Sequence, residues 1–77
     1  MPHSLPSVSG QEVIRALQRL GFQIVRQRGS HVILKRRVSQ IEEISCVVPL
    51  HSDLAIGTLR GILKQARITS EDLVKNL

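Results

Sequence analysis

The spacing of apolar residues changes twice along the chain, and this limits the folds it can adopt. Between residues 13 and 20 apolar residues recur every three or four positions, between 22 and 48 they form short strand-like runs, and between 59 and 66 the helical spacing returns. We therefore expect an α+β fold. With 77 residues, 42% of them hydrophobic, the chain has material for one domain with a single core.

The first helix is marked at both ends. Ser9 followed by Glu12 matches a capping box, the apolar positions of residues 13–20 share one face, and Gly21 ends the pattern. The preceding residues 1–8 contain two prolines and only isolated apolar residues, so we expect a flexible leader outside the fold. The predicted domain is then 9–77.

Three runs favour strands, namely residues 22–27, 31–35 and 44–48. The turn Arg28-Gly29-Ser30 joins the first two as a hairpin, and Pro49 ends the third. A second helix is expected to open at Gly57-Thr58, and a short final one spans 70–76. The predicted order is α-β-β-β-α plus a short C-terminal helix, with a three-stranded antiparallel sheet.

Alternation along the second strand separates its side chains. Val32 and Leu34 fall on one face, while His31, Ile33 and Lys35 fall on the other. If the helices cover the first face, His31 lies on the open face of the sheet.

Eleven Lys and Arg against six Asp and Glu give a formal charge of +5, which favours a polyanionic partner, first of all nucleic acid. Phe22 is the single aromatic residue, so base-stacking platforms are excluded, while contact with the sugar-phosphate backbone remains open. Arg60, Lys64 and Arg67 form a cationic stripe on the second helix. A basic surface that only keeps the protein soluble is the competing interpretation.

Several function classes are excluded. Cys46 is the single cysteine, so no intrachain disulfide forms. We expect its thiol to be an unreactive core group. A chain without disulfides fits a reducing compartment, by default the cytoplasm. No apolar run is long enough to cross a membrane. His3, His31 and His51 lack metal-ligand spacing, so neither a metal nor another cofactor is expected.

His31 is the strongest candidate for chemistry. An imidazole can take and return a proton near neutral pH, and the nearby Arg28 and Lys35 can hold a phosphate and stabilise transition-state charge. A metal-independent ribonuclease needs these groups. It also needs a second group for the other proton, and His51 is a candidate only because it is a histidine. The alternative is a strand histidine that only packs or bonds a backbone carbonyl.

Several blocks of residues, taken together, resemble the HicA toxin family, also called YcfA-like. They are Gly21-Phe22, the run from Arg26 to His31, Val48-Pro49 with His51, and the run from Gly57 to Ala66. The resemblance spans roughly residues 11 to 73, nearly the whole domain.

The resemblance implies a double-stranded-RNA-binding-like sandwich with both helices on one face of the sheet. It also implies an mRNA interferase, an endoribonuclease that arrests translation until a HicB-type antitoxin binds it. The family's catalytic histidine falls on His31, and Gly29 and Ser30 would shape the turn that presents it. We infer RNA contacts for Arg28 and Lys35, and the stripe supplies Arg60 and Lys64 as further candidates.

Two other functions compete with the toxin interpretation. One is a non-catalytic module that holds double-stranded RNA by shape, which would have no use for an imidazole. The other is a partner-binding domain that has lost activity, which the leader and the acidic pair Glu42 and Glu43 support slightly.

Overall fold

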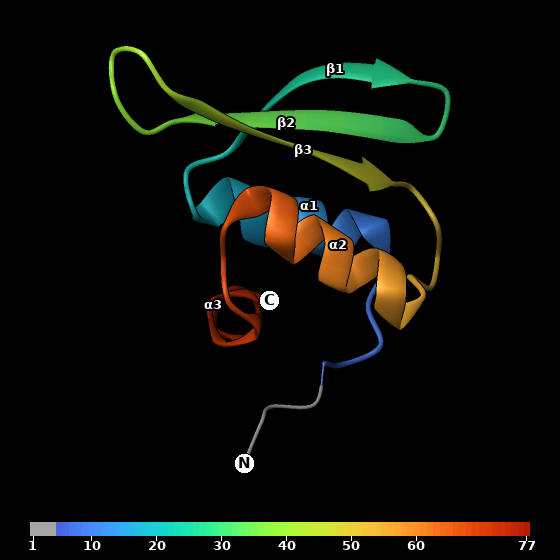
Figure 1. Cartoon of the computed structure of the whole chain (residues 1–77). Coiled ribbons are helices and arrows are strands. Elements are labelled where there is room, and N and C mark those ends of the chain that lie inside the picture. The colour runs from blue at the N-terminus through green and yellow to red at the C-terminus, as the bar shows by residue number, and fades with distance from the viewer. Residues whose placement is uncertain (1–4) are drawn as a thin grey trace.

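The computed structural model describes residues 5–77 and contains three helices and three strands among them. Their bounds are α1 (Gly10–Arg19), β1 (Gln23–Arg28), β2 (His31–Arg37), β3 (Glu43–Pro49), α2 (Ile56–Ala66) and α3 (Ser70–Lys75). This α-β-β-β-α-α order confirms the predicted α+β class and the short final helix. Figure 1 shows α1 and α2 side by side beneath the same face of the sheet.

The sheet is a meander of order β1-β2-β3, and both pairs are antiparallel. A two-residue turn joins β1 to β2, with Gly29 at φ +55° and Ser30 at negative φ. A glycine at the first turn position is the requirement of a type II′ turn, which matches the natural twist of a hairpin. The turn therefore sets Arg28 directly opposite His31.

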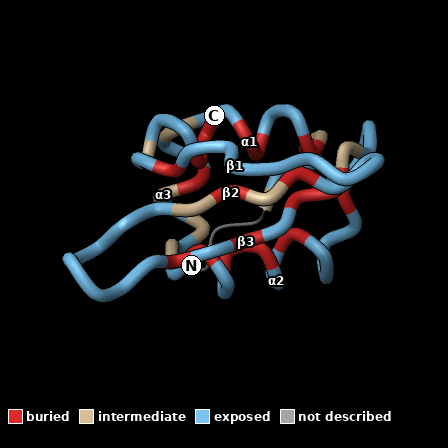
Figure 2. Tube along the Cα trace, turned by 90° about the horizontal axis from the view of Figure 1, so that it is seen from above, coloured by how far each residue is buried: buried red, intermediate tan, exposed pale blue. Residues whose placement is uncertain are grey.

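The two faces of the sheet differ as the alternation predicts. Val32 and Leu34 are buried against the helices, whereas His31 is exposed and Lys35 is only partly covered. Figure 2 shows buried stretches in β2 and β3, while β1 is exposed along its whole length. The open face of the sheet thus remains available for a ligand.

The start of α1 is fixed to the end of β3. The Ser9 hydroxyl accepts from the Glu12 N–H at 3.1 Å, and the Glu12 carboxylate accepts from the Ser9 N–H at 2.9 Å, which is the predicted capping box. The next N–H, of Gly10, donates to the His51 carbonyl at 2.9 Å. A Cβ on Gly10 would lie 1.9 Å from the Pro49 carbonyl oxygen, so only glycine permits this approach.

Part of the segment expected to be a loose leader packs against the core. Val8 is 4% exposed, and Leu5 packs beside the core residues. The Val8 carbonyl accepts from the Leu54 N–H at 2.8 Å, and the Ser7 hydroxyl donates to Asp53 at 2.6 Å. Burial of these apolar side chains offsets the entropy of ordering the segment. Residues 1–4, including His3, lie outside the described residues.

Candidate functional site

The open face of the sheet carries a cationic surface around His31. Cross-strand register and alternation place on it Gln23, Arg26 and Arg28 of β1, His31, Ile33 and Lys35 of β2, and Ser45 and Val47 of β3. We call the four ionisable residues among them, Arg26, Arg28, His31 and Lys35, the open-face cluster. The one carboxylate that shares this face in the three strands, Glu43, lies at the end far from His31 and pairs with Arg37, so the cluster attracts anions.

His31 is held at the corner of this surface by its backbone. It is the first residue of β2, its Cα partners are Arg28 in β1 and Pro49 in β3, and its side chain is exposed. Gln27 Nε2 donates to the Gly29 carbonyl at 3.1 Å and braces the adjoining turn. The imidazole makes no hydrogen bond to any residue in the range 5–77, so both its nitrogens are available to a ligand.

The predicted RNA contacts lie at different distances from His31. Directly opposite residues in an antiparallel pair have Cβ atoms about 5 Å apart, so Arg28 is its immediate neighbour. Lys35 is four residues along the strand, about 13 Å away at the rise of a β-strand. Arg26, opposite Ile33, fills the interval. Sequence reasoning missed Arg26 as a site residue, although its two-residue spacing from Arg28 on a strand was the available signal.

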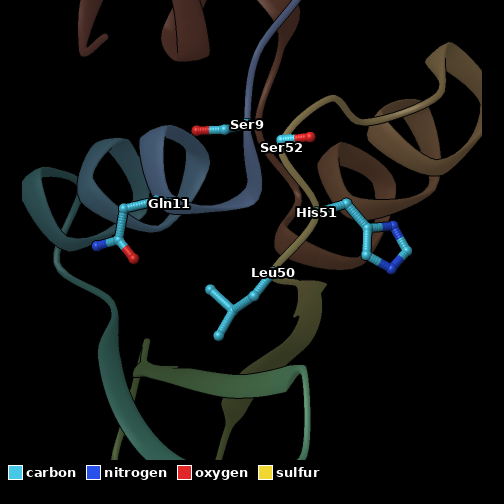
Figure 3. A pocket seen from close by; sticks show the side chains of 5 residues that line it. All are labelled: Ser9, Gln11, Leu50, His51 and Ser52. Carbon is cyan, nitrogen blue, oxygen red and sulfur yellow. The ribbon is translucent and has the colours of Figure 1, made fainter.

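The second predicted proton-transfer residue lies in the segment after β3. The Leu50 N–H donates to the Ser30 carbonyl at 2.6 Å, so this segment joins the turn that precedes His31. An open groove of about 350 Å³ lies here, lined by Ser9, Gln11, Leu50, His51 and Ser52. In Figure 3 the His51 imidazole extends away from Gln11 and Leu50. The structure thus brings both histidines to the same end of the sheet.

The two helix cations predicted to bind RNA lie elsewhere. Arg60 and Lys64 are exposed on α2, away from the buried stripe that packs on the sheet. Because α2 covers the face opposite the open-face cluster, one flat contact does not span both groups (Figure 1).

The two glutamates near the β2–β3 turn are paired with cations. Glu42 lies 3.1 Å from Arg67, and Glu43 lies 3.9 Å from Arg37. Both pairs are largely solvent-exposed and contribute little to stability, but each places positive charge beside the carboxylate. The repulsion that these carboxylates would exert on RNA is therefore reduced.

Other chemistry finds little support in the described part of the chain. Cys46 is 1% exposed, and burial raises its thiol pKa to about 11, so it is a core residue with almost no thiolate at neutral pH. Within residues 5–77 no three His, Cys, Asp or Glu residues gather in a metal-binding group. No helix in that range is both long and apolar enough to span a membrane.

A comparison with curated proteins gives no match to the chain. The family described as "HicA toxin of bacterial toxin-antitoxin" does match, over residues 10–68. The match runs from the first residue of α1 through the sheet to the end of α2, and it includes both histidines of the described site. Since it covers most of the 77 residues, the chain belongs to the HicA toxin family of bacterial toxin–antitoxin systems.

Proposed function

We propose that this toxin is a cytoplasmic endoribonuclease that cleaves mRNA through His31 and is inhibited by a HicB-type antitoxin. The observation that carries the proposal is the exposed His31 imidazole beside Arg28, on a cationic face that no helix covers. A module that only held RNA would need the cations and not the imidazole. Membership of a toxin family also supports the proposal, because a toxin has an activity that harms the cell and an antitoxin that inhibits this activity.

The reaction that suits these groups is transesterification within RNA. The ribose 2′-OH attacks the adjacent phosphorus and loses its proton to a base. The bond from phosphorus to the 5′ oxygen breaks, and that oxygen gains a proton from an acid. The products are a 2′,3′-cyclic phosphate and a 5′-OH. Each step needs a proton carrier and stabilisation of the phosphorane charge, and none requires a metal ion.

In this proposal His31 carries out one of the two proton transfers, and Arg28 binds the phosphate. As its neutral form His31 accepts the 2′-OH proton, or as its cation it protonates the leaving oxygen. Arg28 lies opposite His31 in the hairpin register, and its guanidinium can bind two phosphate oxygens at once. Gly29 and Ser30 form the turn that fixes this register, and Arg26 and Lys35 extend the phosphate track along the face.

His51 is proposed as the group that completes the second proton transfer. It is exposed, its imidazole bonds to no other residue between 5 and 77, and it lies one residue beyond the Leu50–Ser30 hydrogen bond. Its role predicts that His51→Ala lowers kcat/KM by about 10²-fold or more while RNA binding is retained.

The test is cleavage of a long unstructured RNA in EDTA by the native chain and by His31→Ala, at equal folded concentration. We expect the substitution to lower the rate by about 10²- to 10⁴-fold, the usual contribution of a general acid or base, with RNA binding retained. Arg15→Ala, an exposed substitution on α1, is the matched control and should cleave normally. If the native chain and His31→Ala cut alike, the assignment of catalysis to His31 is wrong. If neither cuts while both bind RNA, the non-catalytic RNA-binding module takes the place of this proposal.

A further inference from the structure

The two outer strands of the sheet differ in how their free edges are occupied. In β3 the Val47 N–H donates to Gln65 Oε1 at 3.0 Å, so a side chain of α2 covers that donor. Pro49, two residues further along the same edge, has no N–H to offer. No residue in the described range makes a comparable contact to the outer edge of β1. Near its end the edge of β3 is therefore partly blocked, at Val47 by a side chain and at Pro49 by the lack of a donor, whereas the edge of β1 is bare among the described residues.

The geometry of the turn shows which groups of β1 face outward. The Ser30 carbonyl accepts from Leu50, so Ser30 directs its hydrogen bonds toward β3. Because these directions alternate along a strand, His31 bonds toward Arg28 in β1, and the N–H and C=O of Gln27 point away from the sheet. Backbone groups in this position can bind an added strand.

The side chains along this edge are cationic on one face, while the other face carries Gln27, opposite the buried Val32, and the apolar Ile24. Arg26 and Arg28 lie on the open face, and Ile24, opposite the buried Leu34, lies on the helix face with 48% of its surface exposed. Val25, at a β-bulge between them, is 52% exposed. An added strand would therefore meet arginines on one of its faces, and the Gln27 amide followed by the apolar surface of Ile24 on the other.

We propose that the bare edge of β1 binds an extended segment of the antitoxin in which acidic and apolar side chains alternate. The inference rests on the antitoxin partner of the proposed function. Acidic side chains of the added strand lie beside Arg26 and Arg28, and apolar side chains lie beside Ile24 on the helix face. The bulge at Val25 breaks the regular ladder, so pairing is centred on the stretch from Arg26 to Arg28.

The charge of β1 favours an acidic segment at its edge over a second copy of the chain. Two β1 strands paired with each other would bring four arginines onto one short ladder, two from each copy, and like charges side by side on a sheet destabilise the pair. An acidic segment replaces that repulsion with attraction. It also neutralises the cations nearest His31, so it would lower RNA affinity without touching the imidazole.

The first experiment uses a seven-residue peptide of alternating glutamate and valine, with a lysine–valine peptide of the same pattern as control. Hydrogen exchange of the native chain is followed amide by amide. We expect the glutamate peptide to slow exchange at Gln27 by about tenfold or more, since a bonded amide must open before it exchanges. Equal protection by the lysine peptide, or protection that avoids β1, overturns the proposal. So does protection of Gln27 that rises with protein concentration alone, which would indicate self-pairing.

A pair of variants tests the donor itself. Gln27→Pro removes the outward N–H, while Gln27→Ala keeps it, and both lose the same side-chain bond to Gly29. The glutamate peptide should bind Gln27→Ala like the native chain and Gln27→Pro about tenfold more weakly or worse. Equal binding to both variants would contradict edge pairing. If the proline variant does not fold, the exchange result on the native chain decides. Neither readout involves RNA, so failure of cleavage and failure of edge binding are distinguishable.

Discussion

The N–H of Leu50 donates to the carbonyl of Ser30 at 2.6 Å and joins the segment after β3 to the turn between β1 and β2. Since each residue immediately precedes a histidine, this one bond holds the backbones that carry His31 and His51 at the same end of the sheet. Two groups far apart in the sequence are thereby placed within one region, which would lower the entropic cost of arranging them in the proposed cleavage of RNA.

Substituting glycine by alanine should have opposite effects at two positions. Gly10→Ala puts a Cβ 1.9 Å from the Pro49 carbonyl oxygen, so we expect destabilisation beyond about 2 kcal/mol and displacement of His51, whose carbonyl bonds Gly10. Gly61→Ala in α2 meets open space and should stabilise by about 0.5–1 kcal/mol through helix propensity. Chemical denaturation of both variants measures the difference, and two changes of the same sign would contradict it.

Salt dependence should separate the cations that bind RNA from those that do not. Arg28→Ala removes the proposed phosphate contact on the open face and should reduce the slope of log K against log salt by about 0.7 for a single strand. Arg60→Ala changes a side chain on α2 in the opposite layer and should leave the slope unchanged. Fluorescence anisotropy with labelled RNA gives both slopes. If Arg60→Ala reduced the slope as much as Arg28→Ala does, the RNA would have to contact the helices as well as the open face.

Val8→Ala should show whether the segment before α1 contributes to folding. Val8 is 4% exposed, so loss of its two methyl groups should cost about 1–2 kcal/mol. Val38→Ala, at a valine that is 41% exposed, is the matched control and should change stability by less than about 0.5 kcal/mol. The comparison is made by urea unfolding. Equal values for the two variants would show that the packing of Val8 adds nothing.

The cap of α3 should give stability that depends on pH. Hydrogen bonds from the Thr69 backbone and then from its side chain lower the pKa of the Asp72 carboxyl below its ordinary value. A carboxyl whose pKa is lower in the folded state stabilises above its unfolded pKa, and that stabilisation is lost as the pH falls through the folded pKa. The melting temperature of the native chain should therefore exceed that of Asp72→Asn at pH 7, and the gap should close toward about pH 2. A gap that persists in acid would assign the effect to packing instead of charge.

The sequence was sufficient to predict the features that depend on local pattern. The capping box at Ser9 and the alternation around His31 involve residues two or three positions apart, so the first helix and the open-face placement of His31 follow without long-range information. The α+β class, the element order and the membership of the HicA family are confirmed by the structure and the family match.

Features that depend on contacts between distant segments were not predictable. Val8 is an isolated apolar residue among polar neighbours, and its burial depends on Leu54 and the core. The bulge at Val25 turns Ile24 to the helix face, although simple alternation from Arg28 would put it on the open face. Spacing placed Arg60 on a cationic stripe of the second helix, but nothing in the spacing shows which layer that helix occupies.

The amide of Gln65 has a consequence for assembly. A sheet with two bare edges can add copies of itself at both ends and grow into a fibre, whereas a sheet that accepts strands at one end stops after a single addition. With Gln65 bonded to Val47 on β3, an incoming strand at that edge must displace a side chain of the second helix, which disfavours growth of the sheet from that side.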